Sequence, residues 1–199
     1  FAFAGQARVD MKLADLGNIS MAGSYTGIGW GAIEQRVVQR QREEVIQYDF
    51  STNLELGKFL PKKWGVRLPF YTAYSNITRN PEFDPYDLDI KLKDKINAED
   101  DPDKRREIRT LAQDVTVNRG FNFTNVRKDR VGGKGKVALP WQIENFSFTY
   151  AQNRMQRRTP FIVNDELTQR KLGMDYAYAP GLKPIQPFKK LVKNDKYLK

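Results

Sequence analysis

The feature that most constrains this chain is an alternation of apolar and polar residues with a period of two. From residue 46 to residue 56 every second residue is apolar or aromatic, except for Thr52, and nearly all the residues between them are polar. Because successive side chains of a β-strand point to opposite faces, the pattern predicts a strand with one apolar and one polar face. Such a strand reaches the roughly 9–11 residues that cross a bilayer at a tilt.

The two faces of this pattern predict two different surroundings. The apolar set, with its continuation in the next segment, is predicted to face lipid: Ile46, Tyr48, Phe50, Leu54, Leu56, Leu68 and Phe70. The polar set is predicted to face a water-filled lumen: Gln47, Asp49, Ser51, Asn53 and Glu55.

The alternation recurs along the chain and predicts about six strands. They lie near residues 17–26, 45–59, 65–77, 115–125, 143–155 and 169–179. The early run Val9, Met11, Leu13 is either a further strand or the lower half of the first one. We therefore predict an all-β fold, a segment of an antiparallel transmembrane β-barrel with long loops and one short loop helix.

The predicted connections differ in length. Residues 61–65 form a tight turn that contains Trp64, whereas residues 76–114 form a long loop with a short helix at 103–113. Outer-membrane barrels combine short periplasmic turns with long external loops. A periplasmic 61–65 turn would make residues 26–44, 76–114 and 156–168 external, and residues 125–142 and 180–188 periplasmic. The opposite orientation stays open.

Two residues break the alternation. Arg119 falls on the apolar side of its strand, which predicts a position near a membrane interface or a bulge that shifts the register. Ile143 is out of phase with Phe146, which predicts a bulge near Glu144 and Asn145.

Composition excludes several functions. The chain has no cysteine and no histidine, so Ser-His-Asp sites, Cys-His sites and the usual zinc sites are excluded. The acidic stretch with Glu82, Asp84, Asp87 and Asp89 lacks the spacing and glycine of an EF-hand, and we interpret it as a solvated loop. We predict no catalytic residue, no cofactor site and no metal site, and hence no enzyme.

The net charge of +10 raises the question of nucleic-acid binding. The basic residues are scattered through connecting segments and many have acidic neighbours, which does not fit a phosphate-binding face. We therefore predict no nucleic-acid partner.

Neither end has the features of a complete gene product. The chain begins at Phe1 without an initiator Met, and it ends in the basic stretch 189–199. We expect both ends to be cuts through a longer chain. An isolated open sheet of this kind would expose two edges and an apolar face, so we expect it to aggregate in water.

Four segments carry a resemblance to a known family. They read Asn53–Pro61 (NLELGKFLP), Asn80–Asp89 (NPEFDPYDLD), Phe121–Lys128 (FNFTNVRK) and Ile143–Phe148 (IENFSF). Their order and spacing resemble the cell-surface SprA (Sov) family, the outer-membrane translocon of type IX secretion. The resemblance extends from about Leu13 to Phe188.

The resemblance implies a location and a set of partners. The location is the bacterial outer membrane, where the chain would be part of the wall of a very large protein-conducting barrel that also supports gliding motility. The implied partners are membrane lipid, the remaining strands of the parent barrel, a PorV-type outer-membrane barrel, a periplasmic plug protein and secreted cargo proteins.

Two other interpretations of the alternation remain. A porin or nutrient-receptor barrel has the same two-faced strands. A soluble β-sandwich that binds at a cell surface would cover the apolar face with a second sheet.

Overall fold

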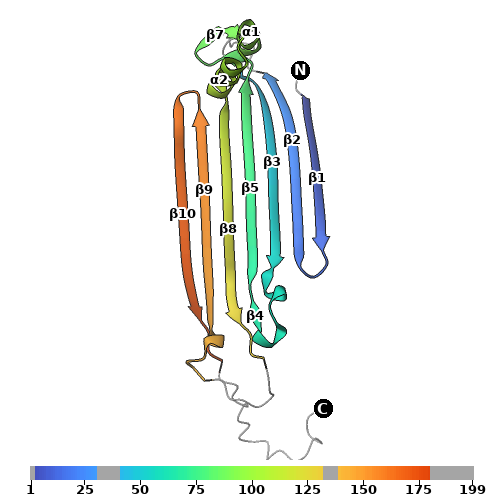
Figure 1. Ribbon diagram of the computed structural model, residues 1–199, viewed down its shortest axis with the longest axis vertical. Helices are drawn as coiled ribbons and strands as arrows, with labels where there is room; N and C mark the ends of the chain where they lie inside the picture. The colour runs from blue at the N-terminus through green and yellow to red at the C-terminus, as the bar shows by residue number, and fades with distance from the viewer. Residues whose placement is uncertain (1–2, 31–40, 132–138, 180–199) are drawn as a thin grey trace, which may run out of the picture.

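The main body of the chain is a single layer of seven long antiparallel strands (Figure 1). The computed structural model describes residues 3–30, 41–131 and 139–179. Each long strand pairs with the next long strand along the chain, so the sheet is a meander. The long strands are β1 Phe3–Leu13, β2 Gly17–Trp30, β3 Gln41–Glu55, β5 Pro69–Pro81, β8 Asp114–Lys128, β9 Phe146–Thr159 and β10 Ile162–Tyr176.

The all-β prediction is confirmed, but the predicted number of strands is too low. β1 is a separate strand that pairs with β2 in continuous register, from Phe3 opposite Gly27 to Leu13 opposite Gly17. Small residues at positions 5 and 7 interrupt its apolar side, which weakens the period-two pattern in the sequence.

Two predicted strands extend beyond the observed strands at one end. β3 ends at Glu55, and Leu56–Phe59 form the 3-10 turn η2. β9 begins at Phe146, and the predicted bulge at Glu144 and Asn145 is the 3-10 turn η4, Ile143–Asn145. The amide of Asn145 holds this turn because it donates to the carbonyl oxygens of Leu139 (2.8 Å) and Pro140 (2.9 Å).

The predicted loop at 156–168 is also corrected. β9 and β10 occupy nearly all of it, and only Pro160 and Phe161 connect them. In this part β9 carries Arg157 and Arg158 and β10 carries Asp165 and Glu166, and these charges hide the alternation that marks a strand in the sequence.

The register of the sheet shifts near the start of β10, between Ile162 and Asp165, and at a bulge in β8. The register of β8 with β9 shifts between Phe123 and Val126, where Asn125 has a φ of 58°. Arg119 precedes the shift, so it keeps the apolar side of its strand, directly opposite Tyr74 of β5. The guanidinium carbon of Arg119 lies 5.7 Å from the centre of the Tyr74 ring.

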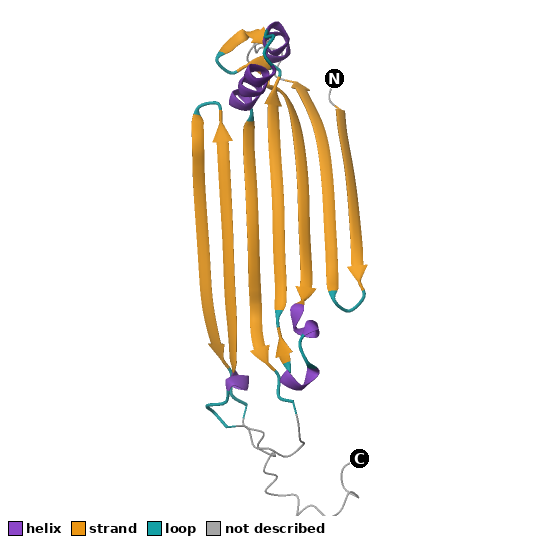
Figure 2. Cartoon of the chain, in the orientation of Figure 1, coloured by secondary structure: helices purple, strands orange, loops and turns teal. Residues whose placement is uncertain are grey.

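The two ends of the sheet carry different connections. At one end lies an insert, residues 82–113, together with the β9–β10 turn (Figure 1). At the other end lie the β1–β2 turn, the 3-10 turns η2 and η3 (Lys62–Trp64), the short strand β4 (Val66–Arg67) and η4 (Figure 2). The predicted periplasmic segment 180–188 lies outside the described residues, as do residues 31–40 of the predicted external segment 26–44 and residues 132–138 of the predicted periplasmic segment 125–142.

The insert is folded, in contrast to the long loop predicted at 76–114. It contains the hairpin β6 (Phe83–Asp84) and β7 (Asp87–Lys91), followed by the helices α1 (Leu92–Ala98) and α2 (Pro102–Ala112). The side chain of Asp101 accepts a hydrogen bond from the backbone nitrogen of Asp103, which caps α2. α1 has no side-chain cap, so it lacks the start signal by which the sequence predicts α2.

A buried ion pair holds the insert together. The side chain of Asp84 is 2% exposed, pairs with Lys95 of α1 and accepts a hydrogen bond from the backbone nitrogen of Tyr86 (3.1 Å). Glu82 lies 3.4 Å from Arg42 of β3. These acids are therefore not all part of a solvated loop as predicted, and no acidic cluster that could hold a metal ion occurs among the described residues.

Apolar burial is confined to the insert. Within the described residues, the only apolar side chains that are fully buried are Leu92 of α1 and Ala112 of α2. Neither helix is long and apolar enough to cross a membrane. The seven long strands have no core of their own, and this defines the surfaces that they offer to their surroundings.

We predict that Lys95→Met loosens the insert and leaves the sheet intact. The substitution leaves the buried Asp84 carboxylate without its cation, which costs about 1–3 kcal/mol of local stability. Hydrogen–deuterium exchange would accelerate in residues 82–113 and stay unchanged in β3 and β5. Lys93→Met, an exposed position of the same helix, removes the same charge and should leave the exchange unchanged. Equal exchange in both variants would contradict the role of the ion pair.

Candidate functional site

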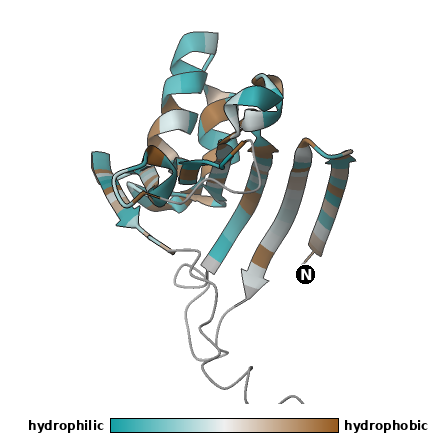
Figure 3. Ribbon diagram, turned by 90° about the horizontal axis from the view of Figure 1, so that it is seen from below, coloured by the Kyte–Doolittle hydropathy of each residue, from teal (hydrophilic) through white to brown (hydrophobic). Residues whose placement is uncertain are grey.

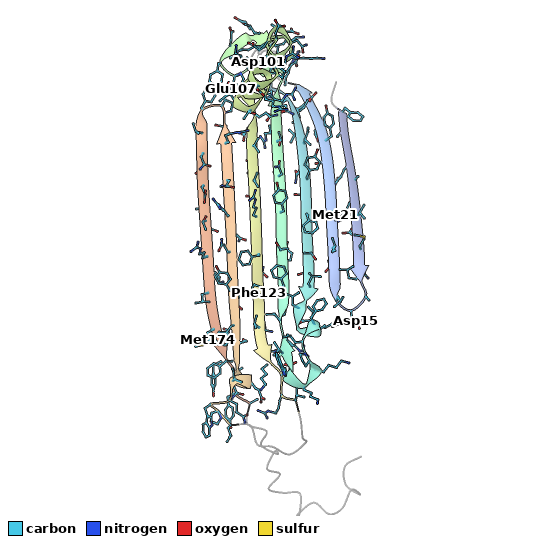
Figure 4. All side chains as sticks on the ribbon, in the orientation of Figure 1. Asp15, Met21, Asp101, Glu107, Phe123 and Met174 are labelled. Carbon is cyan, nitrogen blue, oxygen red and sulfur yellow. The ribbon has the colours of Figure 1, made fainter. Side chains whose placement is uncertain are left out.

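One face of the sheet is apolar over a broad area. The strand register places apolar side chains from all seven strands on this face. They include Val9, Met11, Met21, Ile46, Phe50, Leu54, Phe70, Phe121, Phe123, Phe148, Leu172 and Met174. Met21, Phe123 and Met174 mark this face on β2, β8 and β10 (Figure 4). Many of these side chains are exposed, up to 79% for Leu172.

Two threonine hydroxyls inside this apolar area are bonded to the backbone. The hydroxyl of Thr52 donates to the carbonyl oxygen of Asn18 (3.0 Å), and that of Thr72 donates to the carbonyl oxygen of Gly120 (3.0 Å). Both threonines thereby satisfy their donors without water, as groups in an apolar environment must.

The opposite face is polar and hollow. A hollow of about 750 Å³ extends across this face and is lined by residues of all seven strands. Most of its lining side chains are small or polar, among them Gln6, Ser20, Asp49, Ser51, Ala73, Asn118, Gly120, Asn153 and Gln169. The sheet is therefore concave toward its polar face and convex toward its apolar face.

The five residues predicted to face a lumen lie on the concave face of β3. Asp49 and Ser51 line the hollow, and the amide of Gln47 donates to the carboxylate of Asp49 (2.7 Å). Glu55 lies at the end of β3, where its carboxylate accepts from the backbone nitrogen of Leu68 (2.8 Å). Water contact of these residues stays a prediction.

Of the residues predicted to face lipid, five share the convex face. Ile46, Tyr48, Phe50 and Leu54 lie on β3, and Phe70 lies directly opposite Leu54. Leu56 belongs to η2 and Leu68 lies between β4 and β5, so neither is part of a strand. Contact of the five with lipid stays a prediction.

The curvature distinguishes this sheet from that of a soluble barrel or sandwich. In those folds the side chains of the inner face form the apolar core. Here the inner face is polar and the outer face is apolar, and no second layer of described residues covers the outer face (Figure 3). A sheet of this shape has faces of opposite polarity, apolar on its convex side and polar on its concave side.

Several charged groups of the concave face are paired with close neighbours. Asp10 lies 2.8 Å from Arg8 and accepts from the hydroxyl of Ser20 (2.5 Å). On β9, Arg157 lies 2.9 Å from Asp114 of β8. This arrangement fits a hydrated surface with balanced charge.

Sequence comparison adds a family to this geometry. Residues 2–96 match the family model SprA_N, which is described as motility related/secretion protein. No curated protein matches the chain. The fold and the match define a chain of the all-β class with an amphipathic, single-layer sheet and a role in motility or secretion. The match over residues 2–96 supports membership of the SprA (Sov) family, which the sequence motifs also predict.

One set of residues was missed by the sequence analysis. The sequence already places Arg119 on the apolar side of its strand. The register also places Arg154 and Arg170 on the convex face. Their strands look uniformly polar in sequence at these positions, so the alternation gives no signal there. Only the pairing of β8, β9 and β10 reveals that the three arginines share a face.

We predict that an arginine is tolerated on the concave face and not on the convex face. In the full-length protein, Phe50→Arg places a charge in the middle of the apolar area, where a membrane position would cost about 2–4 kcal/mol. Ser51→Arg introduces the same side chain one residue away on the polar face. The fraction of protein folded into vesicles would fall for the first variant and not for the second. Equal yields would contradict different surroundings for the two faces.

Proposed function

We propose that this chain is part of the wall of a large protein-conducting channel in the bacterial outer membrane. The observation that carries the proposal is the curvature of the sheet, with its apolar side chains on the convex face and its polar side chains on the concave face. A membrane barrel has this arrangement because lipid surrounds it and water fills it.

The slope of the apolar area supports a tilted position in a bilayer. On β3 the apolar residues centre on Phe50. The pairing from strand to strand, through Tyr74, Arg119 and Arg154, places Thr168 of β10 at the same level of the sheet as Phe50. The apolar residues of β10 centre on Met174, six residues further along. Six residues span about 20 Å, and the four strand spacings between β3 and β10 span about 19 Å. The apolar band therefore crosses the strands at about 45°, close to the strand tilt of outer-membrane barrels.

Aromatic and basic residues at one end of the sheet support a membrane interface there. Phe59 and Trp64 are 71% and 56% exposed, and Lys62 and Lys63 lie beside them in the connection between β3 and β5. Tryptophan and lysine are typical of the boundary between lipid and water.

Open edges support a larger parent structure. β1 and β10 each have one unpaired edge in the described sheet. Long unpaired edges invite pairing with further strands. We infer that other strands of the parent chain continue the wall on both sides, and that the sheet curves into a closed barrel only with them.

Small side chains on the concave face support a wide lumen. Ala22, Ala73, Gly120, Ala151 and Gly173 share this face with short polar residues. They leave the inner surface unobstructed, as the passage of folded cargo requires. We propose that the wall acts without catalysis, and that a PorV-type barrel and a periplasmic plug protein are its partners.

We predict that a bulky group on the concave face blocks secretion. The 199 residues contain no cysteine, so Asn118→Cys introduces a unique thiol among them in the middle of this face. In cells with the full-length variant, attachment of biotin maleimide and then streptavidin should stop the release of cargo. The same label on Asp100→Cys, in the exposed connection between α1 and α2, is the matched control.

The outcomes separate the candidate functions. Blocked release with the Asn118 label and normal release with the Asp100 label support a protein-conducting wall. Unchanged protein release together with reduced uptake of small solutes would favour a porin or nutrient receptor. A folded, monodisperse monomer of residues 1–199 in water without detergent would instead favour the soluble sandwich.

A further inference from the structure

The convex face has a second region, which is charged. Above the apolar band on β8, β9 and β10, in the direction of the insert, the face carries four arginines and one glutamate: Arg119, Arg154, Arg158, Arg170 and Glu166. Such a concentration of cations on the side of a sheet that is elsewhere apolar needs a physical explanation.

Three of these arginines follow the edge of the apolar band. We call Arg119, Arg154 and Arg170 the arginine row. Arg119 is two residues from Phe121, and Arg170 is two residues from Leu172. Arg154 lies between them on β9, in register with Arg119 and diagonally beside Arg170. On β9 and β10 the row therefore lies at the boundary of the band and slopes in the same direction, whereas on β8 Val117 and Val115 lie beyond Arg119 on the same face.

The charge of the row is not balanced within the described residues. Arg119 and Arg154 lie directly opposite each other, where like charges destabilise a sheet. Glu166 accepts from Arg154 (2.7 Å), and no ion pair of Arg119 or Arg170 occurs in the described part of the chain. Within the described residues, the ring of Tyr74 is the only group found to offset the positive charge of Arg119, through a cation–π contact. An anion above the row would remove the repulsion.

We propose that the arginine row binds the phosphate groups of anionic lipid headgroups in the leaflet nearest the insert. The inference rests on the proposed membrane position of the convex face. If the apolar band contacts acyl chains, the headgroups lie at its edge, where the row is. Guanidinium groups bind phosphate oxygens through two parallel hydrogen bonds. Arg119 and Arg170 are exposed, and the side chain of Arg154 is 43% exposed, so all three can reach a ligand.

The apolar neighbours make a lipid the best-fitting source of phosphate. A free phosphate ion would contact only the arginines, whereas a lipid also covers Phe121, Tyr150 and Leu172 below them with its acyl chains. Contacts of both kinds make the binding of a phospholipid or a phosphorylated glycolipid stronger than that of the ion alone. Salt should weaken the charged part of the interaction.

The test compares two triple variants of the full-length protein in phosphatidylcholine nanodiscs. Arg119→Gln, Arg154→Gln and Arg170→Gln together remove the row. Arg79→Gln, Arg157→Gln and Lys171→Gln together remove the same charge from the concave face of neighbouring strands. Each protein is titrated with diphosphoryl lipid A, and the bound lipid is measured by native mass spectrometry.

The expected result is a selective loss of binding. Loss of the row should weaken the binding of lipid A at least about tenfold, while the control variant should change it less than about twofold. Inorganic phosphate at the same concentration should not displace the lipid.

Two results would overturn the inference. Equal binding by both variants would show that the row is not the site, and displacement of the lipid by equimolar inorganic phosphate would show a site for free anions. Flotation with vesicles tests the membrane position separately. If the unaltered protein does not float with the vesicles, the proposed function is contradicted. If it floats but shows no preference for lipid A, only the proposed lipid site is contradicted.

Discussion

The backbone hydrogen bonds between neighbouring strands are the interaction on which the whole sheet depends. In the described residues no second sheet or helix layer covers either face, and the only buried apolar side chains belong to the insert. A single layer cannot obtain its stability from a hydrophobic core, which is the dominant source of stability in soluble domains. The seven strands therefore rely on a continuous ladder and on what surrounds the two faces.

This constraint explains the distribution of side chains. The convex face presents apolar groups that must be removed from water, and its threonine hydroxyls donate to backbone carbonyls. The concave face presents short polar residues and ion pairs that remain compatible with water. A bilayer outside and water inside would satisfy both faces at once. The 45° slope of the apolar band is the slope that the tilted strands of a closed barrel would give.

The insert is stabilised differently from the sheet, by buried side chains. Its buried Asp84–Lys95 pair and its two packed helices resemble the interior of a small soluble domain. The hydroxyl of Tyr86 donates to the carbonyl oxygen of Pro160, and its ring contacts Phe161, so the insert is fastened to the β9–β10 turn. It projects from the same end of the sheet as the charged upper parts of β9 and β10, beyond the apolar band. In the proposed membrane position, that end would lie among headgroups and in water.

The sequence alone determined the all-β class, most long strands, the two faces of β3, the helix α2 and the family. These follow from local signals: the period of two, the cap at Asp101 and the family-specific motifs around Asn53 and Asn80. The tertiary structure decided the direction of curvature, the slope of the apolar band and the meeting of Arg119, Arg154 and Arg170 on one face. It also decided that β9 and β10 continue through a charged stretch. The physical reason is that alternation specifies two faces of each strand, whereas only the register between strands specifies which residues of different strands share a face, and at what height.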